Sequence, residues 1–348
     1  MVRYELGKWN LDELVKNPTR TVFDKKLSKI ENSAKNFEKT YKNLLRQNAN
    51  ISSIKLSNLL HSIEIISEKS SIIGGYASLC YSENTQSDEA TSLLTRITKF
   101  GSDIENRLLF FDLWWKRGID EKNAKRLIKS AGQYSEYLKH KRLLAKYSLS
   151  EPEEKIINTL DVTGASALVK LYDKITNAFV YTVTVNGKKK TMGREQLTTL
   201  VRNKSGKIRE AAYKSLLSKY NANKGVTGEI YQNIVLNLRD EGIGMRGFSS
   251  PITIRNISNN IDDKTIETLL CVCKKNSKIF QKYFTKKAKL LGMKKLRRYD
   301  LYAPKKSKSD EKTYSYDKSI KLVLESLSKF SPILSEYAKN VFRQRHVD

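Results

Sequence analysis

Three histidines are the first residues to test for metal-binding or catalytic chemistry, and they lie far apart at His61, His140 and His346. A mononuclear zinc hydrolase needs three protein ligands, and the common helical motif places two histidines four residues apart with a glutamate between them. None of these three histidines has a second one within a helical turn. His61 is followed by Glu64 and Glu68, which predicts a solvated polar helix face, because no further ligand cluster accompanies it. We therefore expect no metal ligand and no catalytic residue in this chain.

The cysteines are equally poor candidates for chemistry. Cys271 and Cys273 lie two apart in a predicted helix, so their side chains point about 200° apart and cannot bind one ion as a pair. We predict that both are small buried residues. Together with Cys80 they are the three cysteines of the chain, a content typical of a reducing compartment.

Three glycines, Gly242, Gly244 and Gly247, have the spacing of a dinucleotide-binding loop. Such a loop follows a strand and opens a helix. Here the glycines follow a predicted helix, and residues 248–254 are predicted to be extended, since the residue before Pro251 is pushed out of the α region. We therefore reject a nucleotide site and expect a glycine-broken loop.

Five polar or aromatic side chains remain as candidates for contact with a ligand. They lie around the predicted extended segment 251–256 and in a second short extended piece at 299–304: Arg246, Arg255, Asn256, Tyr299 and Tyr302. On residue type alone, each is more often a structural hydrogen-bonding group than a ligand contact. Asp300, between the two tyrosines, is expected to cap or brace a turn.

The elements that must position these side chains are mainly helices. Apolar residues recur at helical spacing over residues 25–47, 54–67, 87–115, 120–147, 194–201, 205–220, 228–240, 265–291, 318–329 and 333–345. Ser150 and Glu153 form a capping box with Pro152 in the first turn, which predicts a helix start. Residues 179–185 are β-branched and aromatic, and Asn186-Gly187 then predicts a type I′ turn into residues 188–192. The predicted fold is mostly α, with a multi-helix body and one small β-hairpin insert.

We predict three regions in this fold. Residues 1–116 form an N-terminal helical region that ends in the apolar run 108–115. Residues 117–192 form a helical domain that ends in the hairpin, and residues 193–348 form the first, incomplete part of a further domain. No repeat and no low-complexity linker divides the chain.

Charge and composition exclude several classes of protein. The chain has 65 Lys and Arg against 37 Asp and Glu, a formal net charge of +28. The lysines are spread along nearly every helix, and no zinc-finger spacing or RNA-recognition signature is present, so specific nucleic-acid binding is not expected. No apolar run approaches the about 20 residues of a membrane span, and the N-terminus has no signal-peptide pattern, which predicts a cytoplasmic protein without a membrane partner.

Several ordered segments carry a resemblance to a known family. These are GFSSPITIRNISNNIDD at residues 247–263, AKLLGM at 288–293 and RRYDLYAP at 297–304, together with the helical sequence at 149–176. In this order they resemble the oligoendopeptidase F family, thimet-oligopeptidase-like zinc metallopeptidases that cut short peptides. Members of the family bind zinc through H-E-x-x-H and a downstream glutamate, and this sequence contains no H-E-x-x-H.

The resemblance implies an oligopeptidase-type helical body and short peptides as partners. It places Arg246, Arg255, Asn256, Tyr299 and Tyr302 in the wall of a peptide channel. It also implies zinc as the cofactor of a complete family enzyme, with none bound by this chain alone. The first hypothesis is therefore a peptidase truncated before its zinc-binding helix and inactive by itself. The alternative is a non-enzymatic module that binds peptides, a separate C-terminal catalytic half, or a polyanion.

Overall fold

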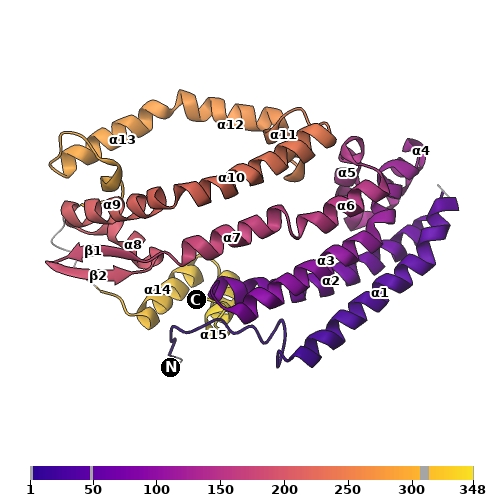
Figure 1. Ribbon diagram of the computed structural model, residues 1–348, viewed down its shortest axis with the longest axis horizontal. Coiled ribbons are helices and arrows are strands. Elements are labelled where there is room, and N and C mark those ends of the chain that lie inside the picture. The colour runs from indigo at the N-terminus through magenta and orange to yellow at the C-terminus, as the bar shows by residue number, and fades with distance from the viewer. Residues whose placement is uncertain (1–2, 48–49, 306–312, 348) are drawn as a thin grey trace. The chain divides into compact units, whose positions relative to one another are not determined.

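A computed structural model describes residues 3–47, 50–305 and 313–347, which fall into two compact units (Figure 1). Unit 1 takes its residues from Met1–Ile30, Glu68–Ile97 and Ser307–Asp348, and unit 2 from Glu31–Ser67 and Thr98–Lys306. The three regions predicted from the sequence stay a prediction.

The structure is mostly α-helical with one two-stranded antiparallel sheet, as predicted (Figure 1). Among the described residues, helices α1 to α7 precede the hairpin: Arg20–Gln47, Ser53–Glu83, Asp88–Leu113, Glu121–Ser130, Ser135–Leu143, Glu151–Asp161 and Ala165–Asn177. Strands β1 and β2 are Tyr181–Val185 and Lys188–Met192. Helices α8 to α15 follow: Arg194–Thr199, Gly206–Ala222, Lys224–Arg239, Pro251–Ser258, Asp263–Lys275, Ser277–Leu290, Tyr316–Phe330 and Pro332–Arg343.

Short helical segments of other pitch connect or extend these helices. Two are π-helical, η1 at Trp114–Gly118 after α3 and η5 at Asp240–Met245 after α10. Four are 3₁₀ turns: η2 at Gly132–Tyr134, η3 at Ala145–Tyr147, η4 at Leu200–Arg202 and η6 at Arg298–Asp300. Extra turns of this kind at helix ends satisfy backbone groups that an α-helix leaves unpaired there.

The predicted start of α6 is confirmed, and polar side chains cap three other helices. The capping box of α6 is present, since the Ser150 backbone N donates to the Glu153 carboxylate at 2.8 Å. Asp120 caps α4 by accepting a hydrogen bond from the Asn123 backbone N at 2.9 Å. Ser315 and Ser331 cap α14 and α15 in the same way. Each cap satisfies an orphan N–H of the first helical turn.

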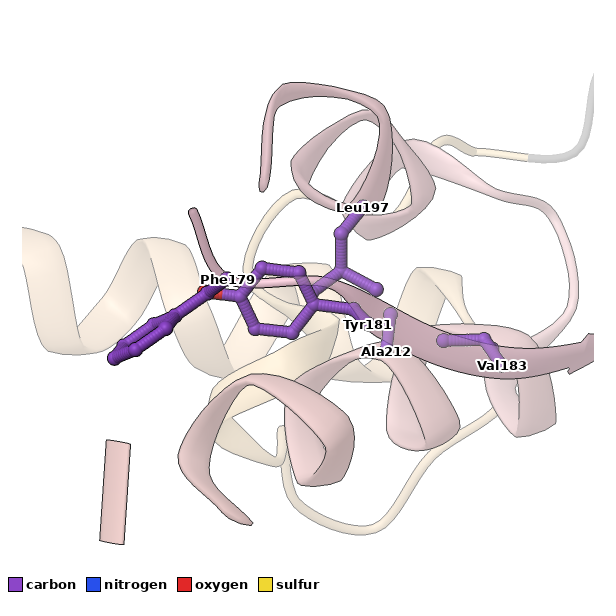
Figure 2. Packing of buried hydrophobic residues seen from close by; sticks show 5 residues of the cluster. All are labelled: Phe179, Tyr181, Val183, Leu197 and Ala212. Carbon is purple, nitrogen blue, oxygen red and sulfur yellow. The ribbon is translucent and has the colours of Figure 1, made fainter. Parts of the chain in front are cut away.

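The predicted hairpin organises one core of unit 2. Asn186 and Gly187 have φ angles of 51° and 75°, the left-handed conformation that a type I′ turn requires at both central positions. Alternation along β1 turns Tyr181 and Val183 inward, where they pack with Phe179, Leu197 of α8 and Ala212 of α9. Figure 2 shows these side chains converging around the strand.

The apolar run 108–115 is buried, as its composition predicts, in a second part of unit 2. Phe110 packs against Phe37 of α1 with ring centroids 5.5 Å apart. Trp115 has no exposed surface, and its indole N–H donates to the Leu138 carbonyl at 2.9 Å. That bond lets a large aromatic ring be buried without an orphaned donor.

Unit 1 joins both ends of the described chain. The Tyr4 backbone N donates to the Asp317 carboxylate at 3.0 Å, and the Asn10 backbone N donates to the Arg345 carbonyl at 3.0 Å. The rings of Phe23 and Tyr76 pack at a tilt of 54°, with centroids 5.5 Å apart. Contacts distant in sequence therefore close this unit.

Three predictions of local structure are wrong. The segment predicted as extended at 251–256 is helix α11: Ser250 alone is extended, and its hydroxyl accepts from the Thr253 backbone N at 3.3 Å. Pro251 then occupies the first helical position, where its fixed φ favours a helix. The predicted extended piece at 299–304 begins instead with the 3₁₀ turn η6, and the predicted glycine loop begins with the π-helical η5.

The predicted helix 265–291 is divided. It is interrupted at Asn276, so that α12 and α13 are two helices, and Gly292 ends the second with a φ of 68°. The prediction that Cys271 and Cys273 are buried is also wrong, because both are exposed. Almost every residue of α12 is exposed, so these side chains have no layer of protein over them.

Candidate functional site

A group of charged and polar side chains faces a cleft of unit 2. The cleft has a volume of about 760 Å³, within the range of ligand-binding sites. It is lined by residues of α3, α5, α6, α10, η5 and α11. Its floor includes a stacked pair, Tyr147 and Phe248, with ring centroids 3.7 Å apart.

Arg246 lines this cleft but is engaged by protein groups. Its Nη1 and Nη2 donate to the two carboxylate oxygens of Glu154 at 2.8 and 2.9 Å, and its Nε donates to Glu241 at 2.9 Å. Burial alone would raise the pKa of Glu154, but the hydrogen bonds from Arg246 outweigh it and hold that pKa below its usual range. These bonds connect α6 with the segment that follows α10.

A second charged cluster lies in the same cleft. Asp112 of α3 accepts from Lys141 of α5 and pairs with Lys116 of η1. Burial opposes the ionised form of Asp112, yet the two lysines hold its pKa below the usual range. The pKa of Lys141 is raised, since Asp112 outweighs the effect of burial. Both partners are therefore charged at neutral pH.

Two further charged side chains line the cleft, Arg255 and Glu105, and neither belongs to the paired clusters described above. Within residues 3–47, 50–305 and 313–347, no side chain or backbone group pairs with the Arg255 guanidinium or the Glu105 carboxylate. Arg255 projects from α11 and Glu105 from α3, and both line the cleft. Burial and the charge of Asp161 raise the pKa of Glu105, and Lys141 opposes the shift. The cleft is therefore lined by a guanidinium and a carboxyl group that have no hydrogen-bond or ion-pair partner among the described residues.

The structure brings only two of the five predicted site residues together. Arg246 and Arg255 line the cleft. Asn256 is buried beside it and donates to the Asp263 carboxylate at 2.7 Å, which joins α11 to α12. Tyr299 and Tyr302 lie around η6, outside the cleft lining. Their role in a peptide channel stays a prediction.

Asp300 is the centre of a buried charge network that residue type alone did not reveal. Its Oδ1 accepts from Nε and Nη2 of Arg209 at 3.1 and 2.6 Å, and its Oδ2 accepts from Nε of Arg297 at 2.7 Å. Burial would raise the pKa of Asp300, but the two arginines hold it below its usual range. The network ties η6 to α9, in agreement with the expectation that Asp300 braces a turn.

Within the described part of the chain, each of the three histidines lies beside a different group. His61 and Glu64 lie on an exposed face of α2, with Nδ1 and Oε2 3.4 Å apart. His140 Nε2 lies 2.6 Å from the Ile257 carbonyl, and His346 Nε2 lies 3.5 Å from the Glu13 carboxylate. In the part of the chain that the structure describes, no group of three or more His, Cys, Asp or Glu side chains could hold a metal.

Sequence and structure comparisons agree with one another. Residues 118–181 match a family model described as Oligopeptidase F. The chain is 27% identical over 218 residues to an oligoendopeptidase F homolog of Lactococcus lactis, covering 60% of this chain and 35% of that protein. It is 22% identical over 204 residues to the group B oligopeptidase PepB of Streptococcus agalactiae, covering 58% of this chain and 33% of that protein.

Two solved structures share the fold. Oligoendopeptidase-F from Enterococcus faecium superposes with a TM-score of 0.71 at 20% identity, over 94% of this chain and 66% of that chain. A peptidase from Chlamydophila abortus superposes with a TM-score of 0.61 at 18% identity, over 98% of this chain and 57% of that chain.

The helical body with its single hairpin is thus an oligopeptidase-type fold. The family-model match over residues 118–181 and the two related sequences show that the chain is similar in sequence to oligoendopeptidase F proteins. It spans about a third of the length of the curated relatives it matches. Among the described residues, no helix is long and apolar enough to cross a membrane.

Proposed function

We propose that this chain is the peptide-binding part of an oligoendopeptidase F-type zinc peptidase and that short peptides bind in the cleft of unit 2. Sequence similarity to oligopeptidases supports peptides as the ligand class. The given sequence contains no H-E-x-x-H, so the role proposed for these residues is peptide binding and not the cleavage step. Its three free thiols are consistent with work in the cytoplasm.

One observation carries the proposal: the cleft contains a guanidinium that the described protein groups do not neutralise. Arg246 is engaged by Glu154 and Glu241, whereas Arg255 is available for a ligand. A guanidinium binds a carboxylate through two parallel hydrogen bonds, so Arg255 is suited to the C-terminal carboxylate of a peptide. Apolar side chains such as Leu108 and Leu238 line the same cleft and provide surface for peptide side chains.

Peptide affinity of the purified chain tests this assignment. We would titrate the chain into a seven-residue peptide labelled on a central lysine side chain and follow fluorescence anisotropy. Arg255→Gln is expected to weaken binding about 10- to 100-fold, since a hydrogen bond to a charged group contributes about 1.5–3 kcal/mol and each 1.4 kcal/mol is about tenfold in affinity. Arg239→Gln, at an exposed arginine of α10 that pairs with Asp240 outside the cleft lining, is the matched control.

The peptide itself provides the second arm of the experiment. Amidation of its C-terminus is expected to weaken binding to the unsubstituted chain as much as Arg255→Gln does, and to have no further effect on that variant. Equal affinity of acid and amide peptides, or an unchanged Arg255→Gln variant, would show that Arg255 does not bind the carboxylate.

Hydrolysis is tested separately. The chain incubated with zinc and an internally quenched peptide is expected to show no turnover, because it lacks the two-histidine motif that holds zinc and its general base. Turnover that co-purifies with the chain and disappears with a chelator would contradict this part of the proposal. A zinc-ligand set outside the family motif would then have to be found.

A further inference from the structure

Glu105 of α3 is a carboxyl group in the wall of the cleft, and binding of a peptide C-terminus does not use it. It lies on the same side of α3 as Leu108, Leu109 and Asp112, because residues three, four and seven positions apart share one face of a helix. All four line the cleft. Among the described residues, no hydrogen bond or ion pair engages the Glu105 side chain, so a bound ligand can reach a carboxylate here.

The part of the cleft around Glu105 is acidic. Burial raises the pKa of Glu105, and the charge of Asp161 at the end of α6 raises it further. The nearest opposing charge is that of Lys141, which is already paired with Asp112. Asp161 accepts a hydrogen bond at 2.6 Å from the hydroxyl of Ser166, a neutral group. Two carboxylates that repel one another favour a positively charged ligand beside them.

Arg255 lies towards a different part of the same wall. Its helix, α11, approaches α5, where His140 Nε2 lies 2.6 Å from the carbonyl oxygen of Ile257. The next residue of α5, Lys141, pairs with Asp112 of α3. These contacts place α11 near the Asp112 end of the α3 wall. The cleft therefore has a guanidinium towards one end and two carboxylates towards the other.

We propose that Glu105 binds the N-terminal ammonium group of a short peptide whose C-terminal carboxylate is held by Arg255. The inference rests on the proposed function. A free peptide has a positive charge at one end and a negative charge at the other, and Glu105 and Arg255 present the complementary signs in one cleft. Ammonium–carboxylate hydrogen bonds are charge-assisted and therefore stronger than neutral ones. An internal stretch of a protein chain lacks both terminal charges, so the cleft would select free peptides.

The spacing along α3 sets the length of the preferred peptide. Glu105 and Asp112 are seven residues apart, which is about 10 Å at a rise of about 1.5 Å per residue. An extended peptide rises about 3.3 Å per residue, so about three residues cover this span. The side chains of Glu105 and Arg255 add reach at the two ends. A peptide of about five residues would place both of its termini on these groups.

A metal ion fits the acidic part of the cleft less well than an ammonium group does. Within the described ranges, no three His, Cys, Asp or Glu side chains are grouped closely enough to hold a metal. An ammonium group needs only hydrogen-bond acceptors, and it donates up to three hydrogen bonds.

Competition between peptides tests the assignment. Unlabelled five-residue peptides of alanine and leucine would displace the labelled seven-residue peptide from the full chain, followed by fluorescence anisotropy. Acetylation of the N-terminus is expected to weaken the five-residue competitor about 10-fold, because it removes the ammonium charge. Glu105→Gln is expected to weaken the free peptide by the same factor and to leave the acetylated peptide unchanged.

Asp103→Asn is the matched control, since it removes one negative charge from the same helix. Asp103 pairs with Lys99 at 2.8 Å and does not line the cleft. This variant is expected to bind free and acetylated peptides as the unsubstituted chain does. An equal loss of affinity in Asp103→Asn and Glu105→Gln would assign the effect to net charge and overturn the proposed contact.

Peptide length provides the second arm of the experiment. Acetylation of an eight-residue competitor is expected to change its affinity less than twofold, because its N-terminus extends past Glu105 when its C-terminus is on Arg255. Equal affinity of free and acetylated five-residue peptides, or the same acetylation effect at both lengths, would refute the ammonium site.

Failure of this inference and failure of the proposed function give different results. Affinity that falls on C-terminal amidation but not on N-terminal acetylation would refute the role of Glu105 and leave that of Arg255 intact. Affinity that depends on the ammonium group and on Glu105, but not on the carboxylate, would refute the role of Arg255 alone.

Discussion

Neutralising Asp300 is expected to destabilise unit 2 strongly. The Asp300 side chain has no exposed surface and that of Arg209 is 6% exposed, so Asp300→Asn leaves a buried guanidinium without its counter-ion. Removing one partner of such a pair costs about 3–5 kcal/mol. Arg297 is 48% exposed, so water screens its pair with Asp300 and we add nothing for that pair to the expected loss of stability. A loss of about 3 kcal/mol corresponds to a fall in melting temperature of about 6–12 °C.

The assay is thermal unfolding followed by circular dichroism at pH 7, with Asp103→Asn as the matched control. Asp103 forms an exposed pair with Lys99, at 2.8 Å, and its neutralisation is expected to have almost no effect. A melting temperature for Asp300→Asn within 2 °C of that of the control would refute the argument that burial makes this network essential.

The pH dependence of the difference in melting temperature between the unsubstituted chain and Asp300→Asn gives a second test. The folded-state pKa of Asp300 lies below its usual range, so the stability it contributes is complete above the unfolded pKa of about 3.9. This contribution is lost as pH falls from that value through the folded pKa. The difference in melting temperature between the unsubstituted chain and Asp300→Asn should therefore become smaller below about pH 4. A difference that does not change with pH would show that the variant loses packing and not an ionic interaction.

Two further substitutions test the segment around the cleft. Gly242→Ala places a methyl group 2.3 Å from Cδ1 of Ile254 and is expected to lower the free energy of unfolding, measured by chemical denaturation, by about 1–3 kcal/mol. Gly244→Ala, whose new methyl group would have no atom within 4 Å, is expected to be neutral or stabilising. Equal effects of the two substitutions would contradict the close approach of Ile254 to Gly242. Glu154→Gln removes the charge that pairs with Arg246 and is expected to lower the free energy of unfolding by about 1.5–3 kcal/mol at pH 7. Because the pKa of Glu154 is lowered in the folded state, this difference should shrink as pH falls below about 4.3, and urea titrations at pH 7 and pH 3.5 would measure it.

Part of this structure could be predicted because its causes are local. The turn at Asn186-Gly187 depends on which residues tolerate positive φ, and the start of α6 depends on the Ser150 and Glu153 side chains reaching neighbouring backbone groups. Such interactions involve residues within a few positions of one another. They form in almost any tertiary context, and the sequence alone was sufficient to predict them.

The backbone conformation was harder to predict where two local preferences compete. Pro251 both restricts the residue before it and favours the first position of a helix. The prediction used the first effect for the whole segment, but the structure shows the first at Ser250 and the second from Pro251 onward. The exposure of Cys271 and Cys273 was not predicted. An amphipathic pattern indicates which face of a helix is apolar, but it does not indicate whether other residues pack against that face.

The candidate site was decided by tertiary structure. The sequence named Arg246 and Arg255 together, but only the fold brings Glu154 to Arg246 from 92 positions away, while no described residue pairs with Arg255 in this way. Arg209 likewise reaches Asp300 across 91 positions. Pairs this distant form only when packed helices bring them together. The sequence by itself therefore indicated the local turns and caps and a resemblance to a family, and the tertiary structure determined which charged side chains of the cleft pair with one another.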